Sequence, residues 1–192
     1  MLIQVIISST REGRFSEKVA PWVVQHLRER GDLDVETVDL RDYPMPFFEG
    51  APPARAPRSY PNPQVARFGQ TIDRADGYVF LIAEYNHSFP AVLKNAFEWT
   101  SVEWRRKPAG FVGWGGVGGA RAIEALRPIV GEYEMVPLRP AVHILPDVMG
   151  AVMQSNGDIA AFEPLKPKLK LLSDDLTWWA RALRTARDAD PE

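Results

Sequence analysis

Residues 77–99 read GYVFLIA, then EYNHSFP, then AVLKNAFEW. The first segment is an unbroken apolar run of strand length, which predicts a β-strand buried on both faces. Pro90 closes the polar, aromatic second segment and suits the first turn of a helix, which we expect over residues 90–100. Ligands bind at the carboxyl ends of strands in open α/β sheets, so residues 84–88 are predicted to form a binding loop.

The rest of the chain repeats the alternation of strand and helix. We expect further strands at residues 2–7, 33–40, 110–114 and 141–145, and further helices at residues 15–30, 63–75, 119–130 and 164–187. Strands that alternate with helical patterns predict a parallel sheet covered on both faces. The predicted fold class is therefore α/β, a flavodoxin-like three-layer sandwich with a five-stranded parallel sheet of order 2-1-3-4-5.

Length and composition narrow the class of protein. A chain of 192 residues that is 45% hydrophobic and 25% charged fits a single globular domain over residues 1–192. Its net charge of −2 provides no general attraction to nucleic acid or anionic lipid, so neither partner is expected. The absence of cysteine excludes disulfides and thiolate catalysis, and no signal segment follows Met1, which favours a cytoplasmic location.

Two other kinds of site are not indicated. His26, His87 and His143 lie in different elements without carboxylates at metal-ligand spacing, so no metal site is expected. No Gly-x-Ser-x-Gly elbow is present either, which disfavours a serine hydrolase.

A proline-rich segment interrupts the alternation between residues 43 and 63. It holds seven of the 17 prolines, so neither a helix nor a strand can run through it. Long loops of this kind are often functional, and the segment either borders the binding site or is a surface excursion. The sequence leaves its role open.

The loop of residues 8–16 combines hydroxyls and arginines directly before a helix. Free backbone N–H groups and the positive end of the helix dipole attract anions there. Ser9, Thr10 and Ser16 can donate hydrogen bonds, and Arg11 or Arg14 can add charge-assisted contacts. The loop is therefore typical of a phosphate site, and the alternative is a capped helix with solvated arginines. Neither a dinucleotide fingerprint nor a Walker sequence is present.

A third loop, residues 114–121, combines four glycines with Trp114. Glycine lets a flat ligand approach the main chain closely, and Trp114 is either a stacking surface or a core residue. Because the carboxyl ends of parallel strands share one edge of a sheet, we expect the three loops to converge. Together they suit a mononucleotide that carries an aromatic ring.

Three ordered motifs resemble those of the NAD(P)H-dependent FMN reductases, which are related to quinone and azo reductases. They are residues 9–14 (STREGR), residues 84–88 (EYNHS) with residues 93–96 (LKNA), and residues 115–119 (GGVGG). The similarity extends from Met1 to about Leu145. Ser8 and Ala83 depart from the glycine and proline that are usual in the family.

The resemblance implies an FMN-dependent reductase. Reduced nicotinamide, NADPH or NADH, would pass hydride to FMN, and a small acceptor such as a flavin, quinone, azo compound or metal oxyanion would then take the electrons. No catalytic side chain is required, because the cofactor carries the chemistry. The implied FMN-binding residues are Ser9, Thr10, Arg11, Arg14, Phe15, Ser16, Glu84, Tyr85, Asn86, His87, Trp114, Gly115 and Gly116. The alternatives are a flavodoxin-type electron carrier and a non-catalytic flavin-binding regulatory module.

The segment of residues 97–104 suggests self-association. Trp99 and Trp104 lie beside the predicted site, and exposed apolar patches usually mark interfaces. We therefore expect a homodimer through this helix, which two further copies can extend to a homotetramer. The alternative is that both tryptophans pack inward against the final helix.

Overall fold

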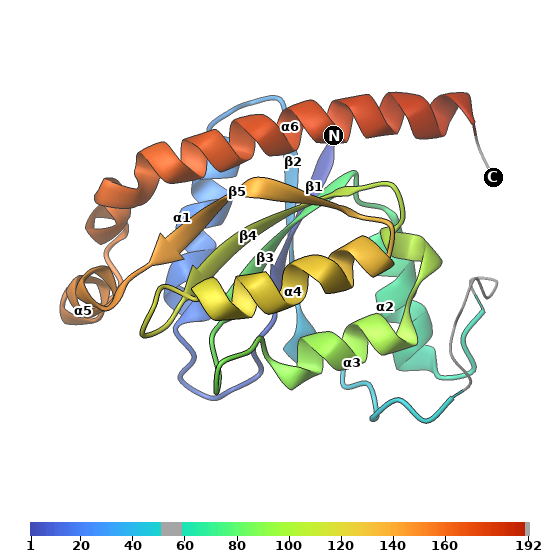
Figure 1. The fold of residues 1–192 in the computed structure, drawn as a ribbon, viewed down its shortest axis with the longest axis horizontal. Coiled ribbons are helices and arrows are strands. Elements are labelled where there is room, and N and C mark those ends of the chain that lie inside the picture. The colour runs from blue at the N-terminus through green and yellow to red at the C-terminus, as the bar shows by residue number, and fades with distance from the viewer. Residues whose placement is uncertain (51–58, 191–192) are drawn as a thin grey trace.

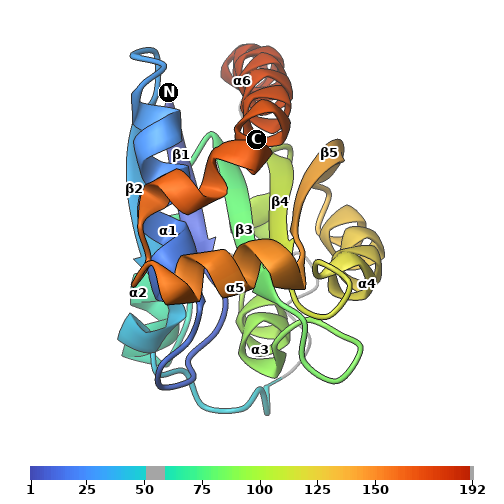
Figure 2. The same cartoon turned by 90° about the vertical axis from the view of Figure 1, so that its left-hand side faces the viewer.

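The computed structural model describes residues 1–50 and 59–190 and contains one five-stranded sheet (Figure 1). Its strands are β1 (Leu2–Ile7), β2 (Asp34–Asp39), β3 (Gly77–Ala83), β4 (Pro108–Trp114) and β5 (Val136–Ile144). All neighbouring strands are parallel and the order is β2-β1-β3-β4-β5, as Figure 2 shows. Every residue of β3 and β4 is buried. The strand predicted over residues 77–83 and the predicted strand order are both confirmed.

Helices cover both faces of the sheet, so the fold has the three predicted layers. One apolar core lies beneath α1 (Ser16–Arg28) and α6 (Lys166–Ala189). The other lies beneath α2 (Pro63–Asp73), α3 (Ala91–Trp99) and α4 (Ala120–Glu132). Three short 3₁₀ segments, η1 (Leu40–Asp42), η2 (Val102–Trp104) and η3 (Ile159–Leu165), complete the connections. No helix in the described part of the chain combines the length and apolar character needed to cross a membrane.

Two elements differ from the expectation. β5 begins at Val136, five residues before the predicted start, although Pro137 and Pro140 lie within it. β5 is an edge strand, and proline is tolerated there because one side of the strand needs no hydrogen-bond donors. A helix that was not predicted, α5 (Pro146–Gln154), follows β5 and begins with proline in its first turn.

The expectation that Trp104 is exposed is wrong. Its ring is 0% exposed and packs against Phe97, Tyr78 and Phe68 in the core beneath α2 and α3. The alternative, that the tryptophans pack inward against the final helix, is right for Trp104 in the direction but wrong in the partner. The final helix α6 covers the core on the opposite face of the sheet. The local pattern of two tryptophans after a helix did not reveal that the chain turns inward through η2.

The proline-rich segment packs on α3 in its described part. Asn95 accepts a hydrogen bond from Phe48 N at 2.9 Å and donates to Pro46 O at 2.9 Å, while Trp99 Nε1 donates to the same carbonyl at 2.8 Å. The Trp99 ring also meets Phe48 edge-on with centroids 5.0 Å apart. The rest of the predicted loop, residues 51–58, lies outside the described residues.

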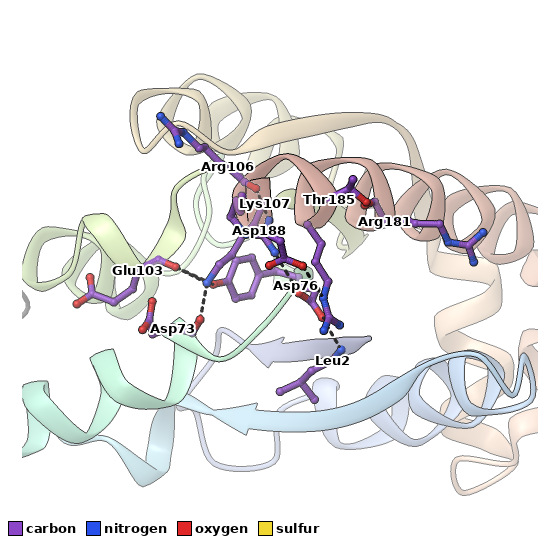
Figure 3. Close-up of polar contacts among 12 residues, drawn as sticks. Leu2, Asp73, Asp76, Glu103, Arg106, Lys107, Arg181, Thr185 and Asp188 are labelled. Carbon is purple, nitrogen blue, oxygen red and sulfur yellow. Dashed lines mark hydrogen bonds and ion pairs between the residues drawn. The ribbon is translucent and has the colours of Figure 1, made fainter. Parts of the chain in front are cut away.

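A polar network binds α6 to the amino-terminal edge of the sheet (Figure 3). Asp76 accepts from Leu2 N at 2.9 Å, from Arg184 at 3.2 Å and from Arg187 at 3.0 Å. Beside it, the buried Lys107 ammonium donates to the carbonyls of Asp73 and Glu103 at 2.7 and 2.6 Å. This edge is opposite the predicted binding loops, and its charges are used to hold elements together.

Candidate functional site

A cleft of about 600 Å³ opens at the carboxyl edge of the sheet, where the loops after β1, β3 and β4 meet. Its lining residues are Arg11, Gly13, Arg14, Phe15, Glu17, Lys18, Ala83, Glu84, Tyr85, Trp114, Gly115, Met149 and Met153. Seven of these were predicted from sequence, and they come from all three loops. The three loops therefore meet around one cleft, as expected from the sequence.

The first and second loops are joined through Tyr85. Its hydroxyl lies 2.7 Å from the Oγ of the buried Ser9, so the two oxygens share a hydrogen bond. The Arg11 guanidinium lies over the Tyr85 ring at 5.3 Å from its centroid, close enough for a cation–π contact. Thr10 points elsewhere and lines a separate cavity of about 300 Å³ beside Arg41 and Tyr43.

The second and third loops are joined through Glu84. Its backbone N–H donates to Trp114 O at 2.9 Å, which extends the ladder between β3 and β4. Its carboxylate, 3% exposed, accepts from Arg121 Nε at 2.6 Å and from Arg121 N at 3.2 Å at the start of α4. Burial by itself raises the pKa of Glu84, but the bonds from Arg121 outweigh it and hold that pKa below its ordinary value. Glu84 is thus an ionised anchor between two loops.

Asn86 and His87 form the tip of the second loop and are exposed. Tyr85 and Ser88 exchange backbone hydrogen bonds at 2.9 and 3.1 Å across them, and both tip residues have positive φ, 49° and 75°. That geometry is a type I′ turn, for which asparagine is a favoured residue and histidine a less common one. These two predicted residues do not line the cleft, and neither does Gly116.

The third loop depends on glycine at its end. Gly119 has φ +72°, and a Cβ atom there would lie 2.6 Å from Trp114 N. Trp114 is 4% exposed and meets Phe15 edge-on with centroids 5.9 Å apart. Its ring therefore belongs largely to the core, and only a small part of it reaches the cleft.

Arg14 is engaged within the protein. Its guanidinium donates to both oxygens of Asp39 at the end of β2 and to the backbone carbonyl of Ser9, and the side chain is 4% exposed. Burial tends to raise the pKa of Asp39, but the bonds from Arg14 and from Arg41 N lower it further than burial raises it. These bonds hold the loop in place, and Arg14 also lines the cleft.

Ser16 is the notable polar residue of the first loop. It is buried at the first position of α1, and its Oγ has no hydrogen-bond partner among the described residues. No side chain caps this helix end, where backbone N–H groups and the helix dipole favour an anion. A buried hydroxyl normally finds a partner, so this position fits an oxyanion supplied by a ligand.

Sequence reasoning missed one wall of the cleft. Met149 and Met153 lie one turn apart on α5, which was not predicted, and Met153 is 61% exposed. The available signal was Pro146 followed by apolar residues at helical spacing, including Val148 and Val152. Lys18 and Glu17 of α1 were missed as well, because they fall after the loop motif.

The arrangement can bind a nucleotide that has a single terminal phosphate. The uncapped end of α1 with Ser16 and Arg11 suits the phosphate, and Tyr85, Gly115 and the edge of Trp114 provide walls for a flat ring. A cleft of this kind above a parallel sheet of order 2-1-3-4-5 defines a flavodoxin-like, nucleotide-binding α/β protein.

Comparison with known proteins identifies the family: the chain belongs to the NADPH-dependent FMN reductases, whose family model matches residues 1–147. An NAD(P)H-dependent FMN reductase of Schizosaccharomyces pombe is 34% identical over 155 residues, which cover 78% of each chain. A 2-hydroxy-1,4-benzoquinone reductase of a Burkholderia species is 29% identical over 193 residues, 95% of this chain and 97% of its own.

A solved structure shows the same fold. FerB, a flavoenzyme NAD(P)H:(acceptor) oxidoreductase of Paracoccus denitrificans, superimposes with a TM-score of 0.68 at 22% identity. The match covers 92% of this chain and 97% of FerB. The resemblance carried by the three sequence motifs is thereby confirmed: the protein is an oxidoreductase that uses FMN and reduced nicotinamide.

Proposed function

We propose that FMN occupies the cleft at the carboxyl edge of the sheet, with its phosphate at the amino-terminal end of α1. The observation that carries this proposal is the buried Ser16 Oγ, which has no hydrogen-bond partner in the described part of the chain and lies at a helix end that no described side chain caps. The terminal phosphate dianion of FMN suits this end better than the diphosphate of FAD, because it concentrates about two negative charges and three free oxygens on one group.

The residues proposed to hold FMN fall into two groups. Ser9, Arg11, Phe15 and Ser16 belong to the loop and helix start at the phosphate end, and Arg14 supports that loop through Asp39. The ring is held by Glu84, Tyr85, Trp114 and Gly115, largely through backbone groups. The hydrogen bonds of Tyr85 and Glu84 already join the three loops in the protein. FMN binding therefore loses little conformational entropy in ordering these loops, which favours tight binding.

The chemistry of the site follows from its cofactor. FMN, when bound, accepts hydride from reduced nicotinamide and passes electrons to an acceptor that replaces the nicotinamide. The protein residues orient the ring, donate hydrogen bonds where negative charge develops and leave one face open. Phe15, Met149 and Met153 make part of the cleft apolar. We therefore propose that the acceptor is a flat aromatic compound, such as a quinone, flavin or azo compound, in preference to a metal oxyanion. The Burkholderia relative, named a benzoquinone reductase, supports this preference.

Rapid mixing tests the reductase function directly. We expect NADPH or NADH to bleach the flavin absorbance of the purified holoprotein anaerobically within the turnover time, and a quinone to restore it. Absence of bleaching by both donors would favour the electron carrier. Bleaching without steady-state turnover on any acceptor would favour the regulatory module.

A serine pair tests the phosphate position. Ser16→Ala is expected to weaken FMN binding by about 1–2 kcal/mol without destabilising the apoprotein, because residues 1–50 and 59–190 provide no partner for that hydroxyl. Ser8→Ala is the matched control: Ser8 donates to Leu81 O, so its loss lowers the stability of the fold. Equal FMN affinity in Ser16→Ala and the unmodified protein would place the phosphate elsewhere.

Three further properties are part of the proposal. The chain is one domain over residues 1–192, supported by a single sheet with a core on each face. It acts in the cytoplasm, an inference that rests on composition alone. It forms a homodimer or homotetramer, although the buried Trp104 removes the reason for placing the interface on α3.

A further inference from the structure

Two arginine side chains bind three consecutive carbonyl groups of the loop after β1. Ser9 O accepts a hydrogen bond from Arg14. Thr10 O accepts from Arg41 Nε at 3.2 Å, and Arg11 O accepts from the same guanidinium group. Arg41 lies in η1, 30 residues after Arg11, and lines the cavity of about 300 Å³ instead of the cleft. A residue outside the cleft therefore holds the backbone of the loop at its phosphate end.

The carbonyl groups and the N–H groups of this loop face different sides. Because β1 lies between β2 and β3, Arg41 after β2 is on one side of the loop, and the cleft walls after β3 and β4 are on the other (Figure 2). In a trans peptide, the C=O of one residue and the N–H of the next point in opposite directions. The N–H of Arg11 accordingly points to Ser9 Oγ at 3.4 Å, and that oxygen is bonded to Tyr85 in the cleft. In the described part of the chain, nothing accepts from the N–H of Glu12, so a backbone donor remains available there.

Two carboxylates hold Arg41 in this position. Its backbone N–H donates to Asp39 Oδ1 at 3.0 Å, and its Nη1 donates to Glu17 Oε1 at 2.8 Å. Asp39 also accepts from Arg14 at 2.7 Å, so one carboxylate positions both arginines. A guanidinium presents its donors in one rigid plane, whereas the lysine ammonium is a single centre on a flexible stem. Arginine is therefore suited to binding two carbonyl groups and a carboxylate at the same time.

We propose that Arg41 is a positioning residue for the FMN phosphate. By binding the carbonyl groups of Thr10 and Arg11, it keeps their negative ends away from the phosphate and leaves the N–H side of the loop turned toward it. Successive backbone N–H groups that face one point form an anion-binding concavity. Without Arg41 these peptide groups are free to rotate, and a carbonyl oxygen that faces the dianion repels it. This role rests on the proposed FMN site, with the phosphate at the start of α1.

Titration of the apoprotein with FMN and with riboflavin tests this role, because riboflavin has the ring but no phosphate. Arg41→Met is expected to weaken FMN binding by about tenfold or more and to leave riboflavin binding within about twofold. Arg74→Met is the matched control: it also removes a guanidinium group, but one that binds Glu36 at 2.8 Å beside the amino edge of the sheet. It should leave both affinities within about twofold of the parent. Urea unfolding checks that each variant is folded. An equal ratio of FMN to riboflavin affinity in Arg41→Met and the parent would overturn the proposal.

Two further variants separate positioning from charge. Arg41→Lys keeps the positive charge but not the planar set of donors, so its FMN affinity is expected to stay close to that of Arg41→Met. Glu17→Gln combined with Arg41→Met removes the carboxylate that Arg41 neutralises, and its FMN affinity is expected to stay low because the two carbonyl groups remain unbound. Recovery of the parent affinity in either variant would assign the effect to charge and overturn the proposal.

The parent protein distinguishes this role from the FMN site on which it rests. A parent that binds riboflavin as tightly as FMN would contradict the phosphate position itself. A parent that prefers FMN, with the same preference in Arg41→Met, would contradict only the role of Arg41.

Discussion

Arg11 and Arg14 are three residues apart in the same loop and have opposite surroundings. Arg11 is exposed at the cleft with its guanidinium over Tyr85, whereas Arg14 is buried and bonded to Asp39. Arg11→Ala is expected to weaken FMN binding by about 1.5–3 kcal/mol through the loss of a charge-assisted hydrogen bond. A fluorescence titration of the apoprotein with FMN measures it, and an unchanged affinity would remove Arg11 from the site.

Arg14→Ala is expected to act on the fold. Removing it leaves the Asp39 carboxylate and the Ser9 carbonyl without their donor. Breaking a buried ion pair costs about 3–5 kcal/mol, and we expect roughly 2 kcal/mol or more here because Asp39 is 20% exposed. Urea unfolding of the apoprotein distinguishes the two arginines. A stability loss in Arg11→Ala equal to that in Arg14→Ala would contradict the assigned roles.

The Glu84 carboxylate predicts a pH dependence with a definite sign. Its pKa in the folded protein lies below the ordinary value of 4.5, so the ionised form stabilises the fold above that pH. This contribution is lost as the pH falls from 4.5 through the lowered pKa, because Glu84 becomes protonated. The free energy of unfolding of the parent should therefore exceed that of Glu84→Gln at pH 7, and the difference should vanish in acid. A difference that is constant from pH 7 to pH 3 would show that the charge of Glu84 is not responsible.

At the scale of elements, the third loop requires glycine at position 119, whereas the interior of α4 does not require glycine at position 131. Gly119→Ala introduces a Cβ 2.6 Å from Trp114 N at a positive φ, so we expect a loss of about 2 kcal/mol or more and weaker FMN binding. Gly131→Ala lies within α4, where no atom is within 4 Å of the new Cβ, and should stabilise the fold by about 0.4–1 kcal/mol. Urea unfolding and FMN titration of both variants measure these effects. Equal stability of the two would contradict the strained turn.

The boundaries of most elements could be predicted, because they depend on local periodicity. β3 matches its predicted range, and α3 differs from its prediction by one residue at each end. β5 and α5 were harder to predict, because proline disfavours a strand or a helix unless its position at an edge or in a first turn is known. That position depends on neighbouring elements, which the local pattern does not contain.

At the scale of the molecule, the two edges of the sheet have different roles. The carboxyl edge holds the cleft, and the amino edge holds the Asp76 network that binds α6. Asp76→Ala is expected to lower the free energy of unfolding by about 1–3 kcal/mol, since it removes the acceptor of three hydrogen bonds, and to leave FMN affinity within about twofold. Asp188→Ala is the control, because its contact with Arg184 is exposed and long at 3.7 Å. A large loss of FMN affinity in Asp76→Ala would show that the two edges are coupled.

The sequence by itself determined the alternation of buried strands with amphipathic helices, and with it the parallel sheet. Because such a sheet brings the carboxyl ends of its strands to one edge, the convergence of the loops at residues 8–16, 84–88 and 114–121 also followed from the chain alone. Seven of the predicted residues line the cleft for this reason.

Only the tertiary structure decided which partner each side chain meets. Arg14 pairs with Asp39, which is 25 residues away, and the loop motif gave no indication of that partner. Trp104 was expected on the surface and lies in the core, while Trp178 of α6 is the exposed tryptophan. Periodicity indicates which side of an element avoids water, but a pairing between distant residues depends on how the elements pack, and a local pattern carries no record of that packing.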